Sequence, residues 1–285
     1  MAVPTYCDIG KSSKDLLGKD FPIGSVKLEV KTLTANGVNF TVNGTQDQKS
    51  GGITGELKTK YADKVNGLTF THSWTTKNLL TTEVEVLNQA AKGLKLNVAG
   101  SLLPVTGGAK NAKVTLDYKQ KNLTAKSVID LFKGPTFHTD LVVGRDGFLA
   151  GGEVGYDLLN GKVTKYTGAL GYTGPDYAVA LHALEGLNLF AASFYHRVSA
   201  DVEAGAKATF DAKSTANAVN LEVGTKYYLD SYSFVKAKIN NAGQLGLGYS
   251  QSLRPGVTVA LGGLFDTSKL NENAHRLGLS LTFGN

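Results

Sequence analysis

The chain of 285 residues lacks several features that would place it in a familiar class. It has 1 cysteine, Cys7, so no internal disulfide can form and nothing indicates an oxidising compartment. Only 6 prolines are present. Proline is poorly tolerated inside a strand, so few positions are unsuited to strands for this reason. No run of 18 apolar residues occurs, which excludes a membrane-spanning helix.

Motifs of enzymes and metal sites are also absent. The 5 histidines stand singly and without metal-ligand spacing, at His72, His138, His182, His196 and His275. There is no Walker A motif, and Gly151-Gly152 lacks the strand-turn-helix context of a dinucleotide site. We therefore expect no catalytic residues, no metal and no cofactor.

The basic character of the chain is spread out. The net charge is +6 and the isoelectric point is about 9.1, yet no block of Lys and Arg occurs. The basic residues fall singly at alternate positions, which argues against a nucleic-acid partner and for a diffuse positive lining.

One pattern is present from residue 26 to residue 283: about ten residues of alternating polarity followed by a turn. Val26, Leu28 and Val30, for example, alternate with Lys27 and its polar neighbours. Turn signals such as Asn-Gly and Gly-Pro-Asp and 34 glycines divide the chain. We place nineteen strands near 25–33, 37–45, 53–62, 67–75, 79–87, 93–102, 110–119, 122–132, 135–144, 147–157, 162–172, 176–184, 187–197, 200–211, 217–227, 231–239, 243–251, 255–264 and 273–283.

The length of these segments favours a barrel in lipid over a soluble sandwich. Segments of roughly nine to eleven residues match tilted strands that cross a bilayer, whereas strands of soluble sheets are usually about five or six residues long. Closure removes the unpaired edges, which lipid does not tolerate. A lysine facing lipid at mid-bilayer costs roughly 2–4 kcal/mol, so the polar faces are expected to line the lumen. The fold predicted is an all-β transmembrane barrel.

The N-terminal segment, residues 1–24, precedes a barrel that we expect over residues 25–285. Residues 5–18 predict an amphipathic helix with Tyr6, Ile9, Leu16 and Leu17 on one face, too short to be stable without docking. The first residues resemble neither a secretory signal nor an Arg-rich presequence. The expected location is the outer membrane of a eukaryotic organelle.

Several motifs resemble those of the mitochondrial porins, the voltage-dependent anion channels, with a fungal character. They are Met1–Pro4, the positions from Tyr6 to Asp15, and residues 67–71, 93–95, 148–151, 227–230, 234–241, 245–249 and 255–257. The resemblance implies nineteen strands with parallel pairing of the first and last, so the count above is not independent of it. It also implies that the N-terminal helix lies inside the lumen.

The resemblance further implies a function and partners. The chain would be a voltage-gated, weakly anion-selective channel that passes ATP, ADP, other metabolite anions and small ions across the mitochondrial outer membrane. It would contact membrane lipids and the mitochondrial import and sorting machinery, and it could form a homo-oligomer.

Candidate site residues follow from the same family motifs. Nucleotide or anion contacts are expected at Lys11, Lys14, Lys19, Gly93, Leu94 and Lys95, and weaker ones at Gln244, Leu245, Gly246, Gly262, Gly263, Leu264, Phe265 and Asp266. Alternation predicts pore-lining lysines that set selectivity at Lys27, Lys31, Lys58, Lys60, Lys113, Lys119, Lys236 and Lys238. The N-terminal lysines could instead only solubilise a helix face, and Gly93 could only begin a strand after a turn.

Two further features complete the expectations. His72 falls between Phe70 and Trp74 on the apolar face, so it is predicted to face lipid, where many animal members of the family place Glu. The C-terminal residues Arg276, Gly278, Leu281 and Phe283 fit the family's insertion signal, although they could simply form a last strand.

Two alternatives remain at this point. A membrane barrel with a role in protein import or assembly would be expected to carry a longer N-terminal extension. A soluble lipid-binding β protein would be extracted from membranes by carbonate.

Overall fold

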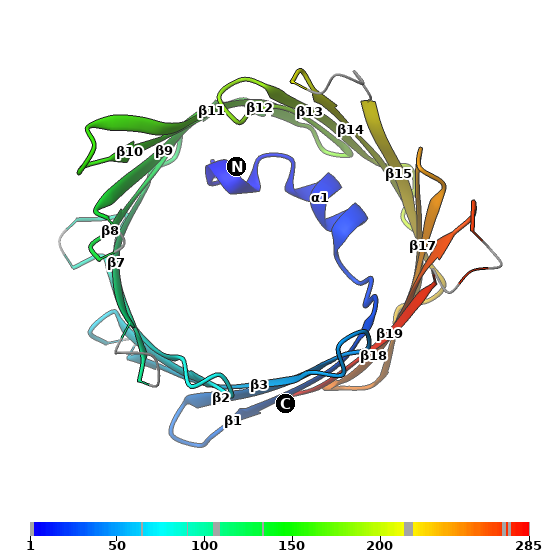
Figure 1. The fold of residues 1–285 in the computed structure, drawn as a ribbon, viewed down its shortest axis with the longest axis horizontal. Helices are drawn as coiled ribbons and strands as arrows, with labels where there is room; N and C mark the ends of the chain where they lie inside the picture. Colours follow the sequence, from blue (N-terminus) through cyan, green and yellow to red (C-terminus); the bar gives the residue numbers. More distant parts are fainter. Residues whose placement is uncertain are drawn as a thin grey trace.

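The computed structural model describes residues 3–63, 65–89, 91–104, 109–132, 134–213, 219–269, 272 and 275–284. In this part of the chain, 19 strands form one closed sheet around a lumen (Figure 1). The elements are η1 (Tyr6–Asp8), α1 (Lys11–Gly18), β1 (Ser25–Leu33), β2 (Val38–Asp47), β3 (Ile53–Asp63), β4 (Leu68–Thr75), β5 (Leu80–Leu87), β6 (Leu94–Leu103), β7 (Ala109–Lys119), β8 (Leu123–Asp130), β9 (Thr136–Arg145), β10 (Phe148–Asp157), β11 (Lys162–Thr173), β12 (Tyr177–Leu184), β13 (Leu189–Arg197), β14 (Val202–Asp211), β15 (Val219–Tyr228), β16 (Ser233–Asn240), β17 (Gln244–Arg254), β18 (Val257–Asp266) and β19 (Arg276–Gly284).

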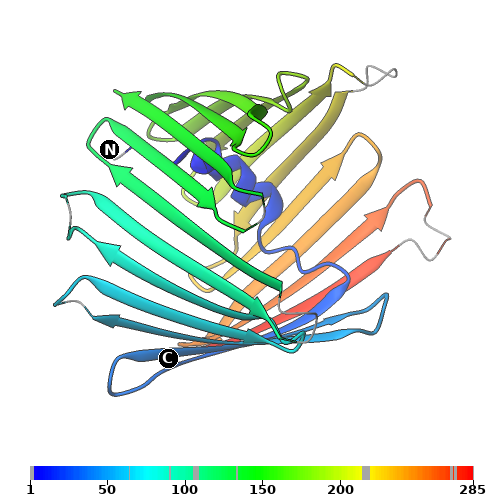
Figure 2. The same ribbon diagram turned by 60° about the vertical axis from the view of Figure 1, so that its left-hand side comes forward.

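The predicted fold class is confirmed, and the predicted strands differ from the observed ones by only a few residues at their ends. Each strand pairs antiparallel with the next, and β1 closes the barrel by pairing parallel with β19. In this seam Val26 lies opposite Leu279 and Lys31 lies opposite Gly284. Figure 2 shows the strands tilted around the barrel. Within the described residues, no helix has both the length and the apolar character that crossing a membrane would require.

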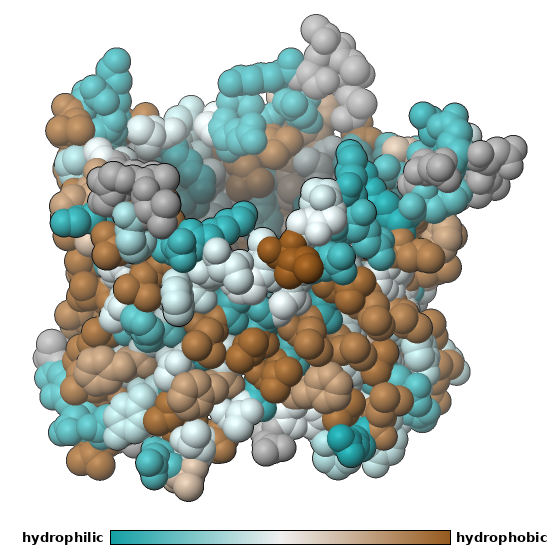
Figure 3. All heavy atoms as spheres, turned by 60° about the horizontal axis from the view of Figure 1, so that its bottom comes forward, coloured by the Kyte–Doolittle hydropathy of each residue, from teal (hydrophilic) through white to brown (hydrophobic). Residues whose placement is uncertain are grey.

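The register gives the barrel two distinct faces. Successive side chains of a strand point to opposite sides, and the pairing keeps like with like: Lys58 lies opposite Thr41 and Ser73, while Leu57 lies opposite Val42 and Trp74. The outer surface therefore carries apolar residues, which Figure 3 shows as a broad hydrophobic band below hydrophilic residues at the rim. The polar faces line the lumen.

The N-terminal segment, defined here as residues 3–24, lies inside the lumen against one side of the wall (Figure 1). The single helix expected over residues 5–18 is divided into η1 and α1 by a break at Gly10. Gly10 has φ +72°, a left-handed conformation that glycine adopts without strain. A Cβ at Gly10 would also lie 3.0 Å from the Ala180 Cβ, so the close approach to β12 requires glycine as well.

Candidate functional site: the lumen of the barrel

The lumen has two unlike sides. The lumenal faces of β1–β7, called here the bare wall, lie across the interior from α1 in Figure 1. The lumenal faces of β8–β19, called the covered wall, meet the segment: η1 contacts β9 and β10, and α1 contacts β13–β15. Residues 20–22 continue this contact onto β17–β19.

The bare wall carries exposed lysines. Alternation and strand pairing place six of the predicted pore-lining lysines on this lumenal face, namely Lys27, Lys31, Lys58, Lys60, Lys113 and Lys119, and all six are exposed. Lys31 pairs with Glu29 at 2.9 Å and Lys113 with Asp130 at 3.8 Å. No ion pair is found for the other four among the described residues. These ammonium groups therefore face the water-filled part of the lumen.

The covered wall is built from small residues. Many of its lumenal positions are glycine, and the segment lies so close that a Cβ there would collide with it. A Cβ at Gly205 would lie 2.8 Å from Leu16 Cδ2, and one at Gly224 would lie 2.7 Å from Leu17 Cδ2. The other glycines of this track also lie against the segment. A Cβ would collide with Val3, Asp20 or Pro22 at Gly144, Gly248, Gly262 and Gly278, and would lie 3.1–3.2 Å from Ile9 or Tyr6 at Gly171 and Gly151.

Docking buries the apolar face of the segment, as its amphipathic pattern requires. Tyr6, Ile9, Leu16 and Leu17 are each 5% exposed or less. Val3, Tyr6 and Ile9 form the main apolar cluster of the described residues together with Val142, Ala169 and Ala180 of the wall. The Thr124 hydroxyl of β8 donates a hydrogen bond of 2.8 Å to the Val3 carbonyl. The segment is thus packed as a core element rather than suspended in the pore.

Lys236 and Lys238 of β16 face the lumen but lie beneath the segment. The Lys236 side chain is only 2% exposed, and its ammonium donates to the carbonyl oxygens of Asp15 (3.0 Å) and Lys19 (2.8 Å). Lys238 donates to the Leu17 carbonyl at 2.8 Å and pairs with Glu222 at 3.0 Å. These two lysines were predicted to line the pore, and the structure shows that they chiefly bind the end of α1.

The lysines of the segment itself are exposed to the lumen. Lys11 pairs with Asp8 at 2.9 Å and Lys19 with Asp15 at 2.7 Å, while no ion pair is found for Lys14 among the described residues. The Thr5 hydroxyl donates to the Asp8 carboxylate at 2.7 Å and, with Lys11 beside it, holds the pKa of Asp8 below its ordinary value. The same ion pair raises the pKa of Lys11.

Residues 93–95 occupy a turn, the outer face of β6 and the lumenal face of β6. Gly93 lies before β6 with φ +83°, and a Cβ there would collide with the Lys119 carbonyl, so the turn itself requires glycine. Leu94 pairs with Tyr118 on the outer face. Lys95 faces the lumen and pairs with Glu85 at 2.8 Å. Of the three, only Lys95 presents a charged group to the lumen.

The weaker candidates near the C-terminus are divided in the same way. Gln244, Gly246, Gly262, Leu264 and Asp266 belong to the lumenal faces of β17 and β18, whereas Leu245, Gly263 and Phe265 belong to the outer face. Gly262 lies directly under Pro22. A solute in the lumen would therefore reach Gln244 and Asp266 more readily than the glycines between them.

His72 lies exposed on the outer face of β4, within a short polar row. It is opposite Thr59 on β3 and Thr82 on β5, and its Nδ1 is 3.0 Å from the Thr82 hydroxyl oxygen. At the C-terminus, Arg276 and Gly278 face the lumen in β19, while Leu281 and Phe283 face outward beside β1.

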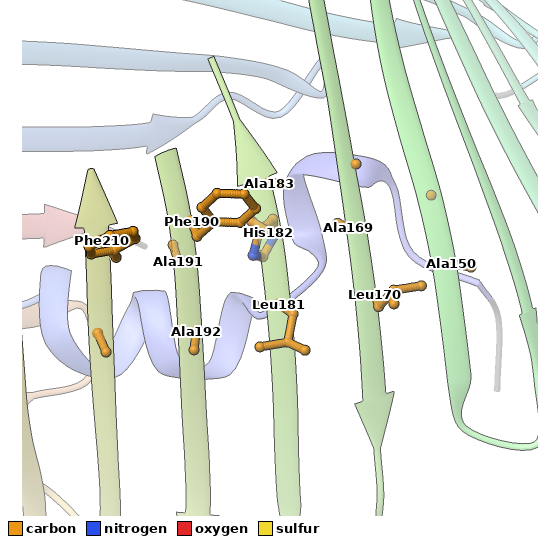
Figure 4. Close-up of a pocket in the computed structure, with 13 residues that line it drawn as sticks. Ala150, Ala169, Leu170, Leu181, His182, Ala183, Phe190, Ala191, Ala192 and Phe210 are labelled. Carbon is orange, nitrogen blue, oxygen red and sulfur yellow. The ribbon is translucent and has the colours of Figure 1, made fainter. Parts of the chain in front are cut away.

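A shallow apolar groove of about 510 Å³ lies on the outer face of β10–β14. Leu170, Leu181, Phe190 and Phe210 border a floor of alanine and glycine. In Figure 4, α1 is seen through these strands, on their far side. The strands here therefore carry small side chains on both faces. The groove opens toward the membrane rather than the lumen.

The alternation rule located the lumenal lysines but missed the glycine track. Gly278 between Leu277 and Leu279, and Gly248 between Leu247 and Tyr249, occupy positions where the polar face elsewhere carries Lys, Thr or Asn. Small residues repeated on the polar faces of consecutive strands were the available signal that something packs against that wall. Within the described residues, no group of His, Cys, Asp and Glu could hold a metal ion.

A closed barrel with an apolar exterior and a charged lumen defines a membrane-spanning β-barrel pore. The chain belongs to the eukaryotic porin family, whose model matches residues 2–278.

Curated relatives match along the whole chain. The mitochondrial outer membrane protein porin of Neurospora crassa is 47% identical, covering 99% of each chain, and that of Candida albicans is 44% identical with the same coverage. The voltage-dependent anion-selective channel of Drosophila melanogaster is 39% identical, again over 99% of each. Among solved structures, a mutant of the Rh. blastica porin aligns with a TM-score of 0.53 at 13% identity, covering 86% of this chain and 99% of that one, a likeness of fold alone.

Proposed function

We propose that the chain forms a voltage-gated, weakly anion-selective channel in the mitochondrial outer membrane, which passes ATP, ADP, other metabolite anions and small ions. The observation that carries this proposal is the bare wall, where exposed lysines line one side of a closed barrel. Ammonium groups along an aqueous path raise the local concentration of anions without forming a tight site. Such a role requires no catalytic group.

Nucleotide passage along the lysines of the segment and of β6 is part of the same proposal. Lys11, Lys14 and Lys19 extend from the docked segment into the lumen, and Lys95 extends from β6. Their charge would attract phosphate groups, although Lys11, Lys19 and Lys95 already pair with carboxylates. Recognition of the β19 residues by the import and sorting machinery, and association with further copies of the chain, are expectations from the family resemblance.

Planar bilayers under a potassium chloride gradient test the proposal. We expect single-channel steps, partial closure under voltage, and a reversal potential that favours chloride over potassium. Equal permeability to the two ions would contradict anion selectivity, and an absence of steps would contradict the channel itself. Replacing Lys19 and Lys95 by Glu should move the reversal potential toward cations; no shift would remove both residues from the selectivity argument.

A further inference from the structure

The strongest directional contacts between the segment and the wall are made by two neighbouring lysines of β16. Lys236 and Lys238 are two residues apart, so both point into the lumen. Their ammonium groups reach the carbonyl oxygens of Asp15, Leu17 and Lys19 at 2.8–3.0 Å. These atoms lie in the last turn of α1 and just beyond it.

This position matches what a helix end requires. The last four carbonyl groups of an α-helix have no partner within the helix, and the C-terminal end carries partial negative charge. Two of these carbonyls, those of Leu17 and of the C-cap residue Lys19, accept from the β16 lysines, while the Asp15 carbonyl accepts from Lys236 in addition to the Lys19 N–H. The lysines therefore act as a C-terminal cap supplied by the barrel instead of by the helix.

Burial makes the contact dependent on the segment. A buried ammonium group is costly unless its donors are satisfied. Among the described residues, the hydrogen-bond acceptors of Lys236 all belong to residues 15–20, including the Asp20 carboxylate at 3.3 Å. The Phe21 ring also lies near both ammonium groups, at 5.3 Å and 4.9 Å. If the segment left the wall, Lys236 would lose these partners together and return to water.

The rest of the docked surface is mainly apolar. Leu16 and Leu17 pack on Gly205 and Gly224, and η1 packs on Gly151. Apolar contacts of this kind hold the segment close but tolerate sliding, since they are not directional. The β16 lysines fix its position along the wall.

We propose that Lys236 and Lys238 are positioning residues that latch the C-terminal end of α1 to β16 and set the balance between the docked and displaced positions of the N-terminal segment. The inference rests on the proposed function, because voltage gating supplies one of its readouts. Among the described elements, the segment is the one that can move in the lumen without breaking strand pairing. Weakening its attachment should therefore change gating while leaving the barrel intact.

The test compares Lys236→Met with Lys58→Met in the full-length chain. Both variants remove one lumenal lysine, but Lys58 is on the bare wall and does not contact the segment. Hydrogen exchange of the protein in lipid nanodiscs is measured for residues 11–20 and, separately, for the strands. Since hydrogen bonds to charged groups contribute roughly 1.5–3 kcal/mol, Lys236→Met should speed exchange in residues 11–20 by about tenfold to a hundredfold.

Further variants separate the latch from general stability. Lys236→Arg, which keeps the donors and the charge, should restore most of the protection. Asp20→Asn leaves the barrel sequence unchanged and should speed exchange in the same direction by a smaller factor, so the proposal stays testable if Lys236→Met does not fold. Lys58→Met should leave exchange in residues 11–20 at the wild-type rate.

Gating provides the second readout. In planar bilayers, Lys236→Met should alter the voltage at which half of the channels close, and Lys236→Arg should restore the wild-type value. Wild-type exchange and wild-type gating in folded Lys236→Met would overturn the latch, as would equally fast exchange in Lys58→Met. If the wild-type protein gave no conductance, the proposed function would fail, while the exchange experiment would still decide whether the lysines hold the segment.

Discussion

The two walls of the lumen use the same strand pattern for different purposes. In β1–β7 the strand glycines, Gly44, Gly55 and Gly100, all face outward, and the lumenal face carries exposed lysines. In β9–β19 most strand glycines face inward, and the lumenal lysines of β16 are covered. A lumenal position thus contributes to conduction where it carries a long, charged side chain. It contributes to docking where it is glycine and has no side chain.

This contrast predicts opposite tolerance to added bulk. Gly205→Val should destabilise the docked segment by roughly 1–3 kcal/mol, because its Cβ would meet Leu16 and the neighbouring Phe194 carbonyl. Gly44→Val, on the outer face of β2, is the control, since nothing lies within 4 Å of its Cβ position. Trypsin, which is too large to enter the lumen, should cleave at Lys11 and Lys14 faster in Gly205→Val than in the wild-type protein.

The outcome that would break the comparison is simple to recognise. Cleavage of Gly44→Val as fast as Gly205→Val would mean that added bulk acts through the barrel as a whole. Cleavage of neither would mean that α1 does not depend on the glycine track.

The contrast also predicts unequal contributions to selectivity. Lys58→Met with Lys60→Met removes two charges from the bare wall, and Lys236→Met with Lys238→Met removes two from the covered wall. A helix is about 10 Å across, which is close to one Debye length at about 0.1 M salt. The segment therefore keeps permeating ions about one Debye length away from the β16 lysines, where the attraction is weaker. We expect the bare-wall pair to reduce chloride preference more, as measured by reversal potential; equal shifts would refute the distinction between the walls.

The smallest expected effect concerns Asp8 at the start of the segment. Thr5→Ala removes the hydroxyl that donates to Asp8, so the pKa of Asp8 should rise toward its ordinary value of about 4. Because the pKa is lowered in the folded state, the stabilisation by Asp8 is present above this value and is lost as the pH falls through the folded pKa. Titration of the Asp8 carboxyl carbon by NMR checks this, with Thr41→Ala on the bare wall as control. An unchanged pKa in Thr5→Ala would assign the effect to Lys11 alone.

The strands and the lumenal side of each lysine were predictable because both depend on local alternation. Lys27 stands between the apolar residues Val26 and Leu28 whatever happens elsewhere in the barrel, so its face follows from the strand itself. The family resemblance supplied the lumenal position of the N-terminal segment and supported the strand count. These parts required no knowledge of which distant residues meet.

The remaining features depend on contacts between distant residues. Whether Lys236 is exposed or buried depends on where residues 15–20 lie, and alternation contains no such information. The break at Gly10 likewise reflects its approach to Ala180 on β12, so a helical pattern over residues 5–18 could not reveal it. The sequence pattern indicates glycine chiefly as a turn former, whereas its use as a flat docking surface depends on which strands lie side by side.

The parallel seam has a consequence for assembly. β1 and β19 are the strands most distant along the sequence, yet they form the pair that closes the barrel. Their pairing has the highest loop-closure cost, so on topological grounds it belongs late in folding, and β1 remains an open edge until then. The N-terminal segment is joined directly to β1 and ends up enclosed. Pro22 lies against Gly278 of β19 and the Gly24 N–H donates to the Leu277 carbonyl, so the last contacts of the segment with the wall form together with the seam.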